Sequence, residues 1–243
     1  MKKILVIIVF LSFHLGSFAQ TKLSQVTYDG TINSRIPINL SLTIDGNLAY
    51  GILTYKKVGQ PIKIIGTIEQ ENFLLHEFGE KAEITGLFYG TKKGDDISGS
   101  WSSPSGKEMK FSVKKSTNAT NDKTEIKTVT GSYAYSFGKD GATGSLYVQQ
   151  VNKEKIIVEM QAVKGAPSYN EATIEKTSLK LVQNEAIYEN TEYGKCKLKI
   201  SFCEDGANII YIGDAYDCGF GNGASVVGNY IKYENKAPKF EKL

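Results

Sequence analysis

The residues of this chain that are suited to chemistry are few and widely separated. Three cysteines, Cys196, Cys203 and Cys218, lie near the end of the sequence. Of the two histidines, His14 belongs to an apolar N-terminal stretch, which leaves His76 as the only histidine in the body of the protein. General acid–base and nucleophilic catalysis most often place a histidine beside a nucleophile. A lone histidine far from every cysteine therefore predicts a protein that is not an enzyme.

The surroundings of His76 favour a structural role for it. The segment 74–78 reads LLHEF, and on a strand the His76 side chain shares a face with Leu74 and Phe78. Neither a Gly-x-Ser-x-Gly elbow nor a nucleotide-binding glycine loop occurs in the sequence, and the Gly-rich stretch 219–223 does not open a helix. We therefore expect a partly buried or rim-facing strand residue and no cofactor.

Metal ligands are equally sparse. A structural zinc site needs four clustered cysteine, histidine or carboxylate ligands and a catalytic one needs three, which this distribution does not supply. Asp214 and Asp217, with Asn222 in the same Gly-rich loop, form a candidate pair for calcium binding or glycoside hydrolysis. Loops also select Asp, Asn and Gly for their turn geometry. We interpret the pair as turn residues and predict no metal site.

The cysteine spacing predicts one disulfide. Cys196 lies on the apolar face of an alternating strand, and this strand turns at Gly206. The chain then returns antiparallel and reaches the level of Cys196 near Cys218, so we favour the pair Cys196–Cys218, with Cys203–Cys218 as the alternative. A loop of this length stabilises the fold by about 3 kcal/mol when it is closed. Either pairing leaves one thiol over.

Most of the chain is predicted to be β-strand. In 36–44 every even position is apolar and every odd position is polar or proline, which is typical of a strand with one buried face. The turn sequence Asp45-Gly46-Asn47 follows directly. Similar units predict strands near 25–32, 36–44, 48–55, 61–69, 72–78, 82–89, 96–101 and 107–113, and then near 130–137, 143–151, 155–163, 178–182, 186–189, 195–202, 208–212 and 224–233. For 168–176 a short helix and a loop are both open.

Short connections between the strands favour antiparallel pairing. The sequence therefore predicts an all-β protein with two tandem antiparallel meander domains. Each domain is either a closed β-barrel or a compact sandwich, and each is long enough for a small core of its own.

Composition divides the chain into five segments. Residues 1–19 are predicted to be a secretory signal peptide, because two lysines precede an apolar run and Ser17-Phe18-Ala19 ends it. The first domain covers 20–115, a polar linker covers 116–127, the second domain covers 128–234, and a charged tail covers 235–243. Export permits disulfides, and the expected location is secreted or periplasmic.

The charge of the chain excludes some classes of partner. Without the signal peptide, 27 Lys and Arg oppose 26 Asp and Glu, so the net charge falls from +3 to +1. A nearly neutral protein has no general attraction to nucleic acid or to anionic membranes. No later segment is apolar over the ~20 residues that a membrane span requires. We expect a small molecule or a protein as partner and leave the oligomeric state open.

Aromatic side chains provide the candidate binding site. The chain has fourteen Tyr, eleven Phe and one Trp. Phe88, Tyr89 and Trp101 are predicted to line the mouth of the first barrel, and the alternative is that they fill its core. Gly-x-aromatic steps such as Gly131-Ser132-Tyr133 and Gly228-Asn229-Tyr230 allow sharp strand coiling with an aromatic ring beside the glycine.

Two resemblances to known protein families add to the prediction of exported β-barrel domains. The first half, with about eight short strands and Gly99-Ser100-Trp101 near its end, resembles small exported bacterial barrels of the avidin and lipocalin type. The second half, with Cys196-Lys197-Leu198 and Cys218-Gly219-Phe220-Gly221, resembles a C-terminal segment of uncharacterised exported bacterial proteins and is similar to periplasmic lysozyme-inhibitor barrels.

Small closed barrels offer a mouth or a set of end loops to a ligand. Together with the resemblances, this favours a non-catalytic exported protein that binds a small apolar molecule, a glycan or an envelope component. The alternatives are a protein–protein interaction module, such as a secreted hydrolase inhibitor, and a structural envelope protein.

Overall fold

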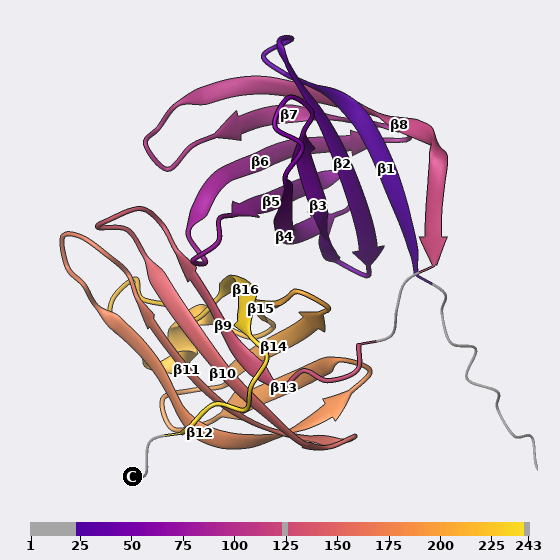
Figure 1. Cartoon of the computed structure of the whole chain (residues 1–243). Helices are drawn as coiled ribbons and strands as arrows, with labels where there is room; N and C mark the ends of the chain where they lie inside the picture. The colour runs from indigo at the N-terminus through magenta and orange to yellow at the C-terminus, as the bar shows by residue number, and fades with distance from the viewer. Residues whose placement is uncertain (1–22, 123–125, 241–243) are drawn as a thin grey trace, which may run out of the picture.

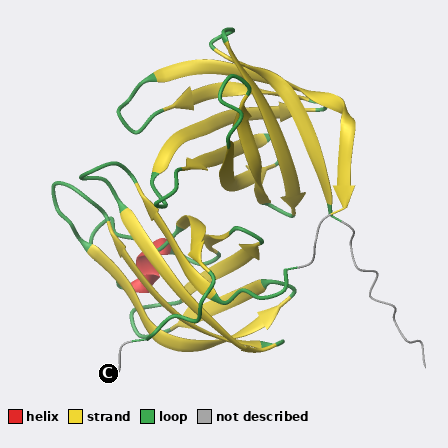
Figure 2. Ribbon diagram, viewed as in Figure 1, coloured by secondary structure: helices red, strands yellow, loops and turns green. Residues whose placement is uncertain are grey.

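The chain folds into two closed, eight-stranded antiparallel barrels in tandem (Figure 1). The computed structural model describes residues 23–122 and 126–240, so the predicted signal peptide, 1–19, lies outside the described residues. Within them the one helical element is a turn of 3-10 helix, η1 (Ala215–Cys218) (Figure 2). None of their helices has the length and apolarity of a membrane span. The all-β prediction with two meander domains is confirmed, and both domains are barrels.

The first barrel (barrel 1) is a meander in which each strand pairs with the next. Its strands are β1 (Ser24–Ile32), β2 (Ile36–Asp45), β3 (Leu48–Tyr55), β4 (Pro61–Glu69), β5 (Asn72–Phe78), β6 (Ile84–Lys93), β7 (Asp96–Ser102) and β8 (Glu108–Asp122). Pairing of β1 with β8 closes the ring and leaves no unpaired edge. The interior is filled by Tyr28, Ile32, Ile38, Leu40, Leu42, Ala49, Leu53, Ile64, Ile68, Phe73, Leu75, Phe88, Ile97, Phe111 and Val113.

The last strand of barrel 1 extends into the predicted linker. Residues 116–122 were predicted to be the start of a polar connection, but they continue β8 and pair with β1 as far as Ser24–Asp122, beyond a register shift. The ladder is made of backbone hydrogen bonds, so a stretch of Ser, Thr and Asn can join it wherever a partner strand lies alongside. The prediction from side-chain polarity therefore ended this strand at 113, whereas the strand continues to Asp122.

The second barrel (barrel 2) has the same order of strands around the ring. They are β9 (Gly131–Ser136), β10 (Thr143–Asn152), β11 (Lys155–Val163), β12 (Glu171–Val182), β13 (Glu185–Asn190), β14 (Cys196–Cys203), β15 (Gly206–Tyr211) and β16 (Gly228–Glu234). Pairing of β16 with β9 closes it. The segment 168–176, left open between helix and loop, is mostly strand from Glu171 onward, because Ala172 and Ile174 alternate inward with exposed neighbours.

The two barrels also share a buried contact surface, which we call the seam. There β4 lies against β15 and β16. Gly206 allows the close approach, since a β-carbon at this position would lie 2.1 Å from Cδ1 of Ile65. Lys63 and Asp205 form an ion pair across the seam at 2.7 Å. The residues of barrel 1 that are buried together with barrel 2 are Leu48, Tyr50, Ile65, Phe78, Ala82 and Ile84. Barrel 1 thus has its own interior, and its outer face is held against its neighbour.

Candidate functional site

The three aromatic residues predicted to line a barrel mouth lie in different surroundings. Phe88 is fully buried inside barrel 1, edge-to-face with Phe111 at a centroid distance of 5.0 Å. Trp101 is the cross-strand partner of Phe88, so it faces the same interior, and it is half-buried. Tyr89 points outward, is 42 % exposed and donates its hydroxyl hydrogen to Glu108. The structure therefore brings Phe88 and Trp101 to one face and separates Tyr89 from them.

Trp101 takes part in a hydrogen-bonded cluster around a buried carboxylate. Glu77 is 5 % exposed, and its Oε2 accepts hydrogen bonds from Trp101 Nε1 at 3.1 Å and from the Tyr55 hydroxyl at 2.9 Å. Its Oε1 accepts one from the Thr85 hydroxyl at 2.9 Å. Burial, and then the charge of Glu77, raise the pKa of Tyr55, which keeps this hydroxyl protonated as a donor. Each carboxylate oxygen is already engaged by the barrel itself, so we interpret the Glu77 cluster as structural.

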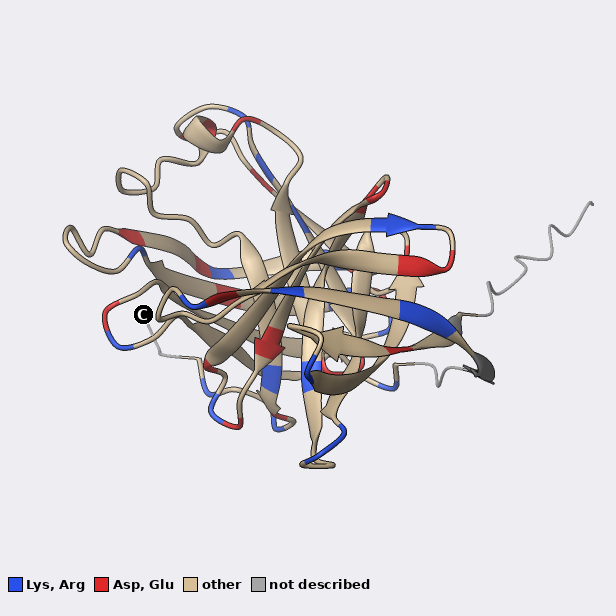
Figure 3. Ribbon diagram, turned by 90° about the horizontal axis from the view of Figure 1, so that it is seen from above, with Lys and Arg blue, Asp and Glu red and all other residues tan. Residues whose placement is uncertain are grey.

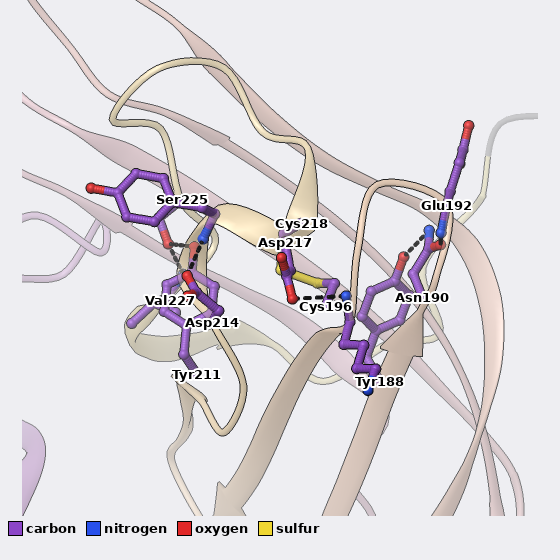
Figure 4. The surroundings of a disulfide bond; sticks show 12 residues. Tyr188, Asn190, Glu192, Cys196, Tyr211, Asp214, Asp217, Cys218, Ser225 and Val227 are labelled. Atoms are coloured by element: carbon purple, nitrogen blue, oxygen red, sulfur yellow. Dashed lines mark hydrogen bonds between the residues drawn. A yellow bond between two sulfur atoms is a disulfide. The ribbon is translucent and has the colours of Figure 1, made fainter.

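The predicted disulfide between Cys196 and Cys218 is confirmed, and it ties the start of β14 to η1 (Figure 4). Cys203 lies buried outside this bond, at the end of β14. The disulfide therefore holds a surface loop against the barrel wall, as the direction of the two strands indicated.

The two aspartates beside the disulfide act as backbone caps. The Asp217 carboxylate accepts a hydrogen bond from the backbone N–H of Lys195 at 2.8 Å, and Asp214 accepts one from the backbone N–H of Tyr216 at 2.9 Å. Asp214 thereby caps η1. Across the described parts of the chain, no three metal-binding side chains cluster. Turn geometry accounts for both residues.

A pocket of about 270 Å³ lies where the two barrels meet, and we call it the His76 pocket. For scale, an engineered apolar cavity of about 150 Å³ holds benzene. Strand β5 of barrel 1 contributes His76, and barrel 2 contributes all the other lining residues. The lining consists of His76, Tyr135, Phe137, Ala142, Val163, Lys164, Gly223, Ser225, Val227, Gly228 and Asn229.

A chain of buried polar side chains fixes the orientation of the His76 ring. The Asn229 amide donates to His76 Nδ1 at 3.1 Å, while its oxygen accepts from the Asn208 amide at 2.7 Å. Because Nδ1 is the acceptor, the proton of the neutral ring is on Nε2. This N–H has no hydrogen-bond partner within the described residues. Burial lowers the pKa of His76 to about 4, so the ring is neutral at neutral pH.

Aromatic rings build the apolar wall of the pocket. Phe137 meets the His76 ring edge-to-face at a centroid distance of 5.5 Å, and Tyr135 meets Phe137 at 6.0 Å. Tyr135 in turn packs edge-on against Tyr230 at 4.9 Å. Such edge-to-face contacts stabilise a fixed arrangement of rings. The wall is therefore a continuous row of rings from the imidazole into barrel 2.

The two strands that hold this wall share a local motif. The Tyr133 hydroxyl donates to the carbonyl of Val129, and the Tyr230 hydroxyl donates to the carbonyl of Val226, each at 2.6 Å. Both tyrosines follow a Gly-x step, so the shared sequence is Val-x-Gly-x-Tyr. The Gly-x-aromatic step was recognised from the sequence, but the valine four residues before each tyrosine was not. The spacing of valine, glycine and tyrosine could have revealed this motif from the sequence, and it shows that β9 and β16 are matching strands at the pocket.

A second pocket, of about 230 Å³, also spans the seam. Its lining is mainly polar and includes Asp45 and Glu69 from barrel 1, with Glu185, Lys199 and Asn208 from barrel 2. Lys199 and Glu185 form an ion pair at 3.0 Å, so part of this charge is already matched. Since Asn208 is hydrogen-bonded to Asn229, the polar chain that ends at His76 runs from one pocket to the other.

Charges of both signs are spread over the ribbons and turns of both barrels (Figure 3). Comparison of the chain with protein-family models, with curated proteins and with solved structures gives no match. The resemblances to avidin- and lipocalin-type barrels and to exported proteins with the Cys-Gly-Phe-Gly segment stay predictions.

Proposed function

We propose that the protein is an exported, non-catalytic binding protein that holds a small molecule in the His76 pocket. The observation that carries this proposal is a pocket between two closed barrels, with an aromatic wall and an imidazole N–H that has no partner in the described chain. Binding sites are typically apolar concavities with a few polar groups that orient the ligand. The packed interior of barrel 1 makes the seam a better location for a ligand than the barrel mouth expected from the sequence.

The environment of His76 favours binding over catalysis. A general base needs a pKa near the working pH and a proton to abstract within hydrogen-bond reach. The pKa of His76 lies well below that range, and its Nδ1 accepts from an amide, which is not a nucleophile. As a neutral donor, the ring is suited to orient an acceptor group of a ligand.

The direct test is native mass spectrometry of the protein purified from its own source. We expect a retained small molecule that is lost in the variant Ala142→Phe, because the new ring fills the pocket. Val151→Phe is the matched control, since Val151 is half exposed on β10 and does not line the pocket. A molecule retained equally by both variants, or its absence from the unmodified protein, would contradict the proposal.

A second candidate function, docking to a protein partner such as a hydrolase, is favoured by one observation. Tyr216 is 92 % exposed, yet it lies on η1, between the Asp214 cap and the disulfide at Cys218. Exposed tyrosines on rigid loops are frequent anchors at protein interfaces. If this candidate is correct, Tyr216→Ala weakens capture of the partner at least tenfold and leaves small-molecule retention unchanged.

A further inference from the structure

We infer that the ligand of the His76 pocket is a compact organic anion with a flat apolar body and one carboxylate-type group. This inference rests on the proposed function and names the class of ligand. The pocket supplies a row of rings for the body, a neutral N–H donor at His76 and an ammonium group at Lys164.

The charge of the lining has one sign. Lys164 is the only lysine or arginine among the lining residues, and none of these residues carries a carboxylate. Two other lysines near the seam are paired, Lys63 with Asp205 and Lys199 with Glu185. Lys164 makes no ion pair within the part of the chain that the structure describes. A ligand that enters the pocket therefore meets one uncompensated positive charge at an exposed position.

The hydrogen-bonding groups of the pocket select acceptors. The Ser225 hydroxyl is already used, because its oxygen accepts from the backbone N–H of Val227 and is hydrogen-bonded to Tyr211. The Asn229 oxygen is used by Asn208. The Tyr135 hydroxyl is hydrogen-bonded to Tyr230. Beside the second N–H of the Asn229 amide, the lining side chains offer the His76 Nε2–H and the Lys164 ammonium as donors, and a lysine has no acceptor capacity. These donors, with no carboxylate among the lining side chains, suit a carboxylate or a phenolate and disfavour an ammonium.

The shape of the pocket limits the rest of the ligand. Phe137 and Tyr135 present an aromatic wall beside His76, and a flat ring system can stack or pack edge-on against it. A volume of about 270 Å³ is below the usual range for drug-sized ligands, which begins at about 300 Å³. One or two fused rings with a single acidic group match both the space and the single lysine.

Three probes with the same ring system test the inference. They are 2-naphthoate, 2-naphthamide and 2-naphthylmethylammonium, each titrated calorimetrically into the full-length protein at low ionic strength. We expect 2-naphthoate to bind about fivefold more tightly than the amide, which is the size expected for one solvent-exposed ion pair, and the ammonium probe to bind most weakly. The preference should shrink as salt is added, because the exposed charge is screened.

Variants separate the charge from the pocket. Lys164→Gln should abolish the preference for naphthoate over naphthamide, while Lys139→Gln should keep it, since Lys139 does not line the pocket. Equal binding of all three probes, lost in Ala142→Phe, would overturn the anion inference and support the proposed function. Tightest binding of the ammonium probe would also overturn the anion inference and support the proposed function. If none of the three probes binds, the anion inference is wrong, and the retained molecule in native mass spectrometry decides the proposed function separately.

Discussion

The two barrels have the same topology but differ in how completely their strands pair. In barrel 1, β1 and β2 stay in register from Gln25–Thr43 to Ile32–Ile36. In barrel 2, β12 meets β13 at Leu181–Ala186 and Val182–Glu185, the two pairs next to their turn, and β13 then continues alongside β14. The ladder of barrel 2 is therefore shorter at this point of the ring. A barrel with a short ladder needs other interactions to keep its shape.

The stabilising interactions differ accordingly. Barrel 1 has the Glu77 cluster at a register shift between β5 and β6, whereas barrel 2 has a disulfide at β14, next to its short strand β13. The loops of barrel 2 also carry most of the His76 pocket and the exposed Tyr216. Binding features often lie on loops that a rigid scaffold positions. Barrel 1 thus contributes His76 from a strand, and barrel 2 contributes the loops at the pocket.

The largest expected loss of stability is in barrel 1. Glu77→Ala removes the acceptor of three donors at once, and we expect the free energy of unfolding to fall by about 4 kcal/mol. Trp101 is the only tryptophan of the chain and lies in this cluster, so its fluorescence during urea unfolding reports on barrel 1. Glu77→Gln, which keeps one acceptor oxygen, is the control and should lose less. An Ala variant as stable as the unmodified protein would show that the cluster does not stabilise barrel 1.

Removal of the disulfide should act on the other barrel. We expect the double variant Cys196→Ser, Cys218→Ser to lose about 3 kcal/mol, because the unfolded chain is no longer constrained. Hydrogen exchange should rise first in β13 and β14, while the Trp101 fluorescence of barrel 1 changes less. Equal loss of protection in both barrels would instead mean that the seam couples them into one unfolding unit.

The seam itself should be sensitive to pH. The pKa of His76 is lowered from 6.5 to about 4 in the folded protein, so the unfolded chain takes up a proton that the folded chain excludes. The contribution of the neutral His76 to the free energy of unfolding is therefore fully present above pH 6.5 and is lost as the pH falls from 6.5 to 4. Between pH 7 and pH 5 this amounts to about 2 kcal/mol.

The measurement is urea unfolding at pH 7 and pH 5, for the unmodified protein and for His76→Gln. The glutamine can still accept a hydrogen bond from Asn229 but does not titrate, so it should lose less stability over this interval. Identical pH profiles for the two proteins would contradict the buried, neutral state of His76.

Local patterns predicted the strands well, because alternation of polar and apolar residues depends on neighbouring positions. They also predicted the disulfide, because the two strands between Cys196 and Cys218 have a definite direction. The seam was not predicted, although the sequence contains a pattern that indicates it. Adjacent apolar residues such as Ile64 and Ile65 break the alternation, and the structure buries one inside barrel 1 and the other against barrel 2.

The His76 pocket was beyond the reach of local patterns. Its central contact joins His76 to Asn229, which are 153 positions apart in the chain. The sequence correctly placed His76 on a strand, but the structure buries it more completely than expected. Neither its amide partner nor the ring of Phe137 follows from the residues around it. Phe88, Tyr89 and Trp101 were predicted together at a barrel mouth, whereas the structure turns Tyr89 to the outer face. The hydrogen bond from Trp101 to Glu77 depends on the curvature that closes the ring.

The smallest expected effect tests whether β9 and β16 are equivalent. Tyr133→Phe and Tyr230→Phe each remove a buried hydrogen bond to a valine carbonyl, which should lower stability by about 1 kcal/mol. Tyr230→Phe also removes the hydrogen bond between Tyr230 and Tyr135. Tyr89→Phe, on the outer surface, is the control. Tyr230 lies beside Asn229 in β16 and packs on the pocket wall through Tyr135. We therefore expect Tyr230→Phe, but not Tyr133→Phe, to weaken ligand binding as well, and equal binding by both variants would mean that the tyrosine bond stabilises the barrel without positioning the pocket.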